Sequence, residues 1–215
     1  IGWPSWAFSN HDAPRWISRW AQPEHAQAYA RVVMLLFVCL RGNIIIWQGE
    51  ELGLTQVEIG FEQLHDPEAI ANWPLTLSRD GTRTPMPWIA DAPAHGFSSG
   101  VSWLPFGVDH GAAAVDQQEG DPRSILLLTR RLIALRSAND ALMQGNVTII
   151  EASQNLLIFS RVSDAQSLLC VFNLGGEVAT WQPDQPDRWQ MIEAVGGATE
   201  WNLPQYSGLV AERIG

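Results

Sequence analysis

Three consecutive polar side chains stand between apolar residues near the start of the chain, in the stretch FSNHDAPRW. Asn10, His11 and Asp12 supply an amide, an imidazole and a carboxylate in adjacent positions, and Pro14 soon interrupts any regular backbone. Asn and Asp are favoured as caps, so these residues either cap a backbone turn or face a polar ligand. If they face a ligand, the rest of the chain must supply their partners.

Two further groups of charged residues follow along the chain. Glu50 and Glu51 come after an apolar run in WQGEELGL, and Arg79 and Arg83 stand four residues apart in SRDGTRTPMPW. Taken alone, the carboxylates can simply favour a helix N-terminus, and the arginines can form a solvated pair. Guanidinium groups also offer a planar fork that suits carboxylates and hydroxyl-rich ligands.

The composition excludes several classes of partner. The net charge of −10 over 215 residues argues against nucleic acid, because a phosphate binder needs a cationic face. The longest apolar run, VVMLLFVCL, is interrupted at Arg41 and is too short to span a membrane. Cys39 and Cys170 lie inside apolar runs, which predicts buried free thiols and fits a reducing, cytoplasmic compartment.

The first part of the chain has the pattern of an α/β protein. Residues 23–41 predict a helix, with Pro23 in its first turn and a stop at Arg41-Gly42. The following run NIIIWQ, residues 43–48, predicts a strand that is buried on both faces. Glu50 and Glu51 then lie at the carboxyl end of this strand, where α/β sheets and barrels bind their ligands.

The pattern changes twice after this strand. Residues 54–121 are irregular, apart from a short helix that Asp66 caps and Pro67 opens, and a connection of this length is usually a lid or a binding loop. A second long helix begins at Asp121-Pro122 and ends before Asn139. From Val147 onward, short β runs separated by turns predict an antiparallel all-β domain, so we place a domain boundary near residue 145.

The segments NHD, QGEELGL and RDGTRTPMPW, in this order, resemble the α-glucosidase branch of the α-amylase superfamily, which includes the oligo-1,6-glucosidases. NHD resembles the fourth motif of the superfamily, and RDGTRTPMPW is similar to the branch signature RDxxRTPMxW. The resemblance covers essentially the whole chain. It implies that residues 1–144 are the C-terminal portion of a (β/α)8 TIM barrel, about its last two strand-helix units, with an active-site loop at 54–121. Residues 145–215 are then an incomplete C-terminal β-sandwich domain.

The resemblance also implies a role for each polar group. Asp12 matches the carboxylate that stabilises the transition state of a retaining α-glucosidase and keeps the neighbouring acid protonated. His11 and Arg79 are expected to bind the sugar, and Arg83 either binds it too or braces the loop.

Four further residues are expected to support this site. Glu50 and Glu51 would orient their loop, and Asn10 and Arg15 would fix the backbone and the charge around Asp12. No metal site and no cofactor is expected.

In this family the nucleophile and the general acid precede the fourth motif, and no matching segment appears in these residues. We therefore expect a C-terminal fragment of a bacterial, cytoplasmic enzyme that hydrolyses terminal α-glucosidic bonds of small oligosaccharides with retention. The fragment alone would be inactive, and its partners would be the oligosaccharide substrate and the missing N-terminal part of the enzyme. Two alternatives remain open, a non-catalytic carbohydrate-binding module and a glucosyltransferase of the same superfamily.

Overall fold

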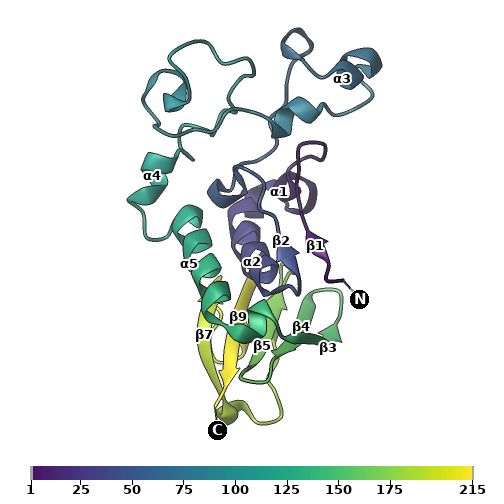
Figure 1. The fold of residues 1–215 in the computed structure, drawn as a ribbon, viewed down its shortest axis with the longest axis vertical. Helices are drawn as coiled ribbons and strands as arrows, with labels where there is room; N and C mark the ends of the chain where they lie inside the picture. Colours follow the sequence, from purple (N-terminus) through teal and green to yellow (C-terminus); the bar gives the residue numbers. More distant parts are fainter. Residues whose placement is uncertain (1, 215) are drawn as a thin grey trace. The chain divides into compact units, whose positions relative to one another are not determined.

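The computed structural model describes residues 2–214, which form two compact units (Figure 1). One unit, here called the sheet unit, contains residues 2–6, 27–44 and 129–214. The other, here called the loop unit, contains residues 7–26 and 45–128.

The loop unit consists of short helices and irregular connections, as the pattern of residues 54–121 predicts. Its helices are α1 (Trp16–Trp20), η1 (Pro23–His25), η2 (Glu50–Leu52), η3 (Phe61–Gln63), α3 (Pro67–Asn72), η4 (Arg79–Thr82), η5 (Pro93–Gly96) and α4 (Val115–Glu119). The predicted cap of α3 is confirmed, because the Asp66 carboxylate accepts a hydrogen bond from the Glu68 N–H at 3.2 Å and Pro67 opens the helix. A small core of Leu52, Leu54 and Leu126 supports these turns.

The two long helices are confirmed with shifted ends. The predicted helix 23–41 is the 3-10 turn η1 followed by α2 (Ala26–Cys39), and the second is α5 (Ile125–Ala138). Asp140–Met143 forms an additional short helix, α6. Residues 32–39 of α2 are all buried, because this helix is apolar on almost every side.

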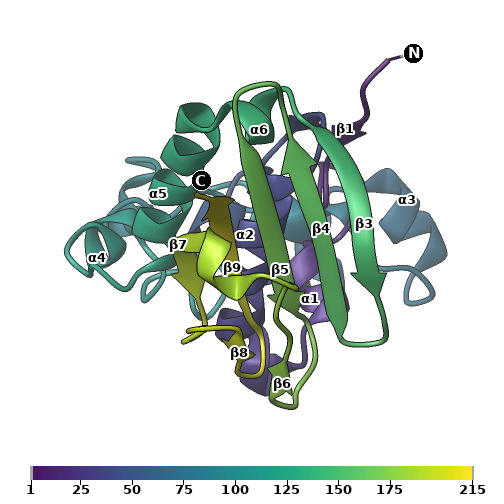
Figure 2. The same ribbon diagram turned by 90° about the horizontal axis from the view of Figure 1, so that it is seen from below.

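The sheet unit is built on a five-stranded antiparallel sheet in the order β3-β4-β5-β9-β7 (Figure 2). Its strands are β3 (Asn146–Ala152), β4 (Leu156–Val162), β5 (Ser167–Asn173), β7 (Trp189–Val195) and β9 (Ser207–Arg213). A short ribbon pairs β6 (Ala179–Thr180) with β8 (Asn202–Leu203). The β runs predicted from Val147 onward are confirmed, but β9 was not among them, although it lies between β5 and β7.

Both faces of this sheet are covered. On one face, Ile158, Leu169 and Leu209 pack with Leu203 of the ribbon and with partly buried tryptophans. The other face is covered by the parts of α2 and α5 that belong to the sheet unit (Figure 2). Alternating side chains of β5 therefore reach a core on either side, and this accounts for the burial of six consecutive residues, 168–173.

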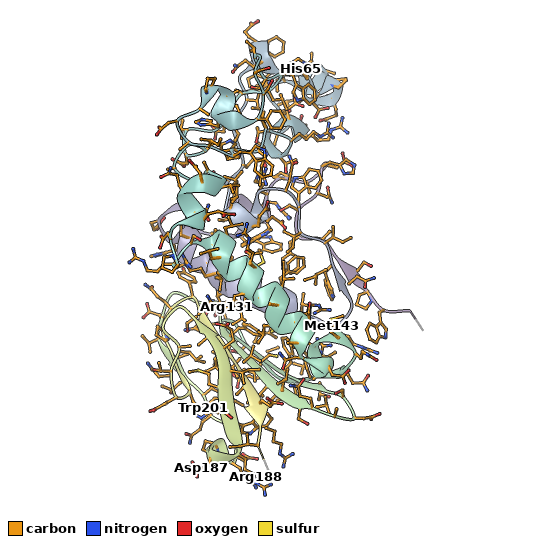
Figure 3. The ribbon with its side chains drawn as sticks, turned by 60° about the vertical axis from the view of Figure 1, so that its left-hand side comes forward. His65, Arg131, Met143, Asp187, Arg188 and Trp201 are labelled. Carbon is orange, nitrogen blue, oxygen red and sulfur yellow. The ribbon has the colours of Figure 1, made fainter. Side chains whose placement is uncertain are left out.

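Side chains also join the helices to the sheet. Arg131 lies on α5 (Figure 3). It donates to both carboxylate oxygens of Glu193 on the edge strand β7, at 2.9 and 3.2 Å. This bidentate pair links α5 to the β7 edge of the sheet.

The prediction of a strand over residues 43–48 is wrong for most of this range. Only Asn43–Ile44 forms a strand, β2, which pairs in parallel with β1 (Ser5–Trp6). The expected burial on both faces is wrong, because Asn43 is exposed and Ile45 is 53% exposed. A buried parallel strand needs strands on both edges and cover on both faces. Within residues 2–214, β1 is the single strand beside β2, and no closed barrel forms.

Candidate active site

Asp12 lies in the loop between β1 and α1, and its neighbour Asn10 shapes that loop. The Asn10 side-chain oxygen accepts hydrogen bonds from the N–H groups of Asp12 at 2.8 Å and Ala13 at 2.9 Å. This local turn leaves the Asp12 carboxylate free of any capping task. Its side chain is 57% exposed and is available to a ligand.

Two arginines from one turn face this carboxylate. Arg79 begins the 3-10 turn η4, Arg83 follows its last residue, and both side chains reach the same carboxylate. The Nη1 of Arg79 lies 3.4 Å from Oδ1 of Asp12, and the Nη2 of Arg83 lies 3.1 Å from the same oxygen. Arg83 also donates from Nε to the carbonyl oxygen of His11 at 2.8 Å. Arg83 therefore braces the loop and contacts Asp12 at once.

His11 completes the group on the other side of the carboxylate. Its Nε2 lies 3.2 Å from Oδ2 of Asp12, and its side chain is 64% exposed. The ring centroid of Trp47 lies 6.1 Å from that of His11. The indole Nε1 of Trp47 donates to the carbonyl oxygen of Thr82 at 3.0 Å, and this hydrogen bond holds the Trp47 ring against η4.

Asp66 holds Arg79 from behind. Its side chain is fully buried and accepts hydrogen bonds from Nε of Arg79 at 2.9 Å, from Nη2 at 2.5 Å and from the Arg79 backbone N–H at 3.0 Å. The hydrogen bonds from Arg79 hold the pKa of this carboxyl well below its usual range. The same bonds raise the pKa of Arg79, so both groups are ionised.

A buried group of charges lies in the same unit. Arg15 is 1% exposed and donates to the carbonyl oxygens of Gln48 and Thr82. Burial lowers the pKa of Arg15 to about 10. The negative charges of Glu50 and Glu51 act in the other direction and raise this pKa. Arg15 thus ties its own segment to the backbone at Gln48 and at Thr82 of η4.

Glu50 is 3% exposed and accepts a hydrogen bond from the Trp47 N–H at 2.9 Å. Burial raises the pKa of Glu50 to about 7, although hydrogen bonds from Ser9 and Trp47 and the charge of Arg15 oppose the shift. Burial likewise raises the pKa of Glu51. These two carboxylates belong to the interior of the loop.

The structure thus brings Asp12, His11, Arg79 and Arg83 together. Asn10 belongs to the same turn as Asp12 and bonds to its backbone. Arg15, Glu50 and Glu51 lie in the buried group, and the hydrogen bonds of the Arg15 guanidinium go to backbone carbonyls rather than to Asp12. Sequence reasoning missed two contributors. The sequence pattern predicts Trp47 only as part of a strand and Asp66 only as a helix cap.

The arrangement presents an exposed carboxylate between two guanidinium groups and an imidazole. Carboxylate oxygens accept hydrogen bonds from hydroxyl groups, while guanidinium N–H groups donate to hydroxyl oxygens. A carboxylate in this position can also stabilise a positive charge that develops on a bound molecule. Within residues 2–214, no group of three or more His, Cys, Asp or Glu side chains is arranged to hold a metal ion.

The chain belongs to the α-amylase family, since residues 1–145 match the model of the alpha-amylase catalytic domain. Among curated proteins, the chain is 45% identical over 181 residues to a probable alpha-glucosidase of Rhizobium meliloti, covering 83% of this chain and 32% of that protein. It is 31% identical over 201 residues to a probable oligo-1,6-glucosidase of Bacillus subtilis, covering 84% of this chain and 36% of that protein. The resemblance to the α-glucosidase branch is confirmed, and the chain spans about a third of these relatives.

Solved structures give the same result for the fold. An alpha-glucosyl transfer enzyme, XgtA, superimposes with a TM-score of 0.90 at 38% identity, covering 99% of this chain and 40% of that chain. The isomaltulose synthase of Erwinia rhapontici superimposes with a TM-score of 0.87 at 23% identity, covering 100% of this chain and 43% of that chain, and at this identity it supports the fold alone. Relatives of this chain therefore include both glycoside hydrolases and enzymes of glucosyl transfer.

Proposed function

We propose that this chain is the C-terminal part of a retaining exo-α-glucosidase that hydrolyses terminal α-glucosidic bonds of small oligosaccharides. The observation that carries the proposal is the exposed Asp12 carboxylate, faced by Arg79 and Arg83 at 3.4 and 3.1 Å and by His11 at 3.2 Å. An oxocarbenium-like transition state needs a carboxylate nearby and groups that bind the sugar hydroxyls.

In this proposal each polar side chain has one task. Asp12 stabilises the developing positive charge and binds sugar hydroxyls, and His11 donates to a hydroxyl in the glycone subsite. Arg79 closes the site over the non-reducing end of the sugar, and Arg83 binds the sugar while bracing the loop of His11. Such contacts accelerate the reaction only as far as they tighten in the transition state.

Four supporting residues maintain this geometry. Asn10 holds the turn that carries Asp12, and Arg15 joins the neighbouring loops through their carbonyl groups. The buried Glu50 and the half-buried Glu51 orient their loop and take no part in bond cleavage.

The rest of the enzyme supplies the nucleophile and the general acid. Residues 1–144, with the loop 54–121, are then the last part of a TIM barrel, and residues 145–215 are a C-terminal β-sandwich domain. The match to the catalytic domain, which stops at residue 145, and the antiparallel sheet that follows both support this division. The partners of the chain are the N-terminal part of the enzyme and the oligosaccharide.

We place the enzyme in the bacterial cytoplasm, and the two buried free cysteines support a reducing compartment. Separately, no helix within residues 2–214 combines the length and the apolarity needed to cross a membrane.

Turnover of an aryl α-glucoside tests the proposal. The complete protein is expected to release the phenol and to form the α-anomer of glucose first, as proton NMR detects, whereas the 215-residue chain alone is expected to be inactive. Replacing Asp12 by Asn in the complete protein should lower kcat by about 100- to 1000-fold, the usual cost of removing one stabiliser of transition-state charge. The exposed Asp164→Asn is the matched control. Turnover by the chain alone, or an Asp12→Asn variant with full activity, contradicts the proposal.

A second activity is glucosyl transfer, which the similarity to XgtA favours. Product analysis at high acceptor sugar concentration separates the two reactions. A transferase gives mainly new disaccharides under these conditions, and a hydrolase still gives mainly free glucose.

A further inference from the structure

We propose that Asp66 is a positioning residue that presents Arg79 to the sugar, an inference that rests on the proposed function. Arg79 reaches the site from a short 3-10 turn on a long irregular connection, and its side chain is 36% exposed. A long side chain in such a place samples many rotamers unless another group holds it. The structure supplies that group.

Arg79 and Asp66 form a bidentate pair between guanidinium and carboxylate. One edge of the guanidinium, Nε and Nη2, donates to the two carboxylate oxygens of Asp66 at 2.9 and 2.5 Å. This bidentate pairing defines the plane of the guanidinium as well as its position. The remaining nitrogen, Nη1, is turned toward Oδ1 of Asp12 at 3.4 Å. Asp66 thus determines which edge of Arg79 faces the site.

Asp66 is itself held in place by a second buried carboxylate. The Oδ2 of Asp80 accepts hydrogen bonds from the backbone N–H groups of His65 at 2.7 Å and Asp66 at 2.8 Å. Asp80 is 1% exposed, and its own N–H donates to the Ser78 hydroxyl at 3.0 Å. The backbone at Asp66 is therefore held by hydrogen bonds to the Asp80 carboxylate.

The charge of Asp66 has a separate consequence. Arg79 pairs with Asp66 at 2.5 Å and with Asp12 at the longer distance of 3.4 Å, so its charge is shared between the two carboxylates. Without Asp66, the whole charge of Arg79 is free to pair with Asp12. A closer Arg79–Asp12 pair would add to the contact that Arg83 already makes with Oδ1 at 3.1 Å, and the substrate would have to displace Arg79 as well.

The decisive variant is Asp66→Ser in the complete protein. Serine keeps an acceptor for the N-cap of α3 but removes the fork that holds Arg79. We expect kcat/KM for an aryl α-glucoside to fall by about 100-fold, the cost of misplacing a binding group by about 1 Å. Asp121→Ser is the matched control, because Asp121 also caps a turn, through the Arg123 N–H at 2.9 Å, and pairs with Arg123. The control should keep the kcat/KM of the unaltered protein.

A double-mutant cycle separates positioning from a merely structural role. If Asp66 acts through Arg79, adding Asp66→Ser to Arg79→Ala should change kcat/KM by less than about twofold beyond Arg79→Ala alone. Losses that simply add, or an Asp66→Ser variant with unchanged kcat/KM, overturn the inference.

A crystal structure of the complete Asp66→Ser protein gives a readout without turnover. Arg79 should leave its place or move against Asp12, and an Arg79 that keeps its position would equally overturn the inference. If the unaltered enzyme shows no turnover, the proposed function fails, and the crystal structure still decides the role of Asp66.

Discussion

The two oxygens of the Asp12 carboxylate have different surroundings. Oδ1 faces both arginines, whereas Oδ2 faces the imidazole of His11. The cationic side of the group is built from side chains that other residues hold, since Asp66 fixes Arg79 and Arg83 is anchored to the His11 carbonyl. A binding site is more accurate when its side chains are supported in this way before the ligand arrives.

Burial of Glu50 makes the stability of the protein depend on pH. The pKa of Glu50 is raised to about 7 from an ordinary value of 4.5, so the folded state binds more protons than the unfolded state between these pH values. Raising the pH through this window therefore lowers the free energy of unfolding, by on the order of 3 kcal/mol in total above pH 7. Below pH 4.5 the cost disappears, because Glu50 is protonated in both states.

Glu50→Gln should remove this cost while keeping an acceptor for the Trp47 N–H. The melting temperature of the variant relative to the unaltered protein should rise from pH 4.5 to pH 8, as calorimetry measures. Glu58→Gln, at an exposed position, should show no such trend. A difference between Glu50→Gln and the unaltered protein that is independent of pH would contradict the assignment.

At the same scale, sequence reasoning identified the residues that meet at Asp12 but not the residue that holds Arg79. The motif residues could be recognised because their types and order are distinctive. Asp66 could not, because its N-cap role before Pro67 already accounts for an aspartate there. Its partner stands 13 residues away along an irregular stretch, where no periodicity relates the two positions.

Among the elements, α2 has an unusual C-terminus. Its final carbonyl groups face two buried arginines of the same unit, Arg136 of α5 and Arg161 of β4. Arg136 donates to the carbonyl oxygens of Val38 and Leu40, at 2.6 and 2.9 Å, and to that of Gly42. The fully buried Arg161 donates to that of Cys39 at 2.6 Å. Two cations at the C-terminus of α2 interact favourably with the helix dipole. They also donate to carbonyl groups that lack partners within the helix.

Arg161→Met should therefore destabilise the protein by about 3 kcal/mol, since it leaves buried carbonyl groups of Cys39, Leu142 and Gly145 without donors. Chemical denaturation measures this loss. The control is Arg188→Met, because Arg188 is exposed in the 3-10 turn η6 (Pro186–Arg188) (Figure 3). Equal stability of the two variants would show that the buried charge costs as much as its hydrogen bonds contribute.

The elements themselves were predictable where local pattern and tertiary environment agree. The helices α2 and α5 carry strong apolar periodicity, and β3, β4, β5 and β7 have β-branched or apolar runs between turns. The prediction of a buried strand over residues 43–48 is wrong because, within residues 2–214, β2 pairs with β1 alone and residues such as Ile45 stay exposed. The strand β9 was missed because Gly208 and the charged end of the strand weaken its pattern, although its position between β5 and β7 buries residues 207–211.

For the molecule as a whole, the parallel pair β1-β2 has consequences for a chain expressed by itself. Two short parallel strands present unpaired N–H and C=O groups at their outer edges, and Ile45, which follows β2, is 53% exposed. Exposed edges beside apolar side chains pair with other chains. We therefore expect the 215-residue chain alone to associate at about micromolar concentration, as sedimentation velocity measures.

Ile45→Lys should reduce this association, because a charged side chain beside an exposed edge opposes pairing with another chain. Leu75→Lys is the matched control, since Leu75 is 86% exposed and lies on the loop between α3 and η4. If Leu75→Lys dispersed the chain and Ile45→Lys did not, the exposed loop rather than the strand edge would be the cause. Under the proposed function, addition of the N-terminal part of the enzyme should also disperse the chain, because the strands of the remaining barrel would then pair with β1 and β2.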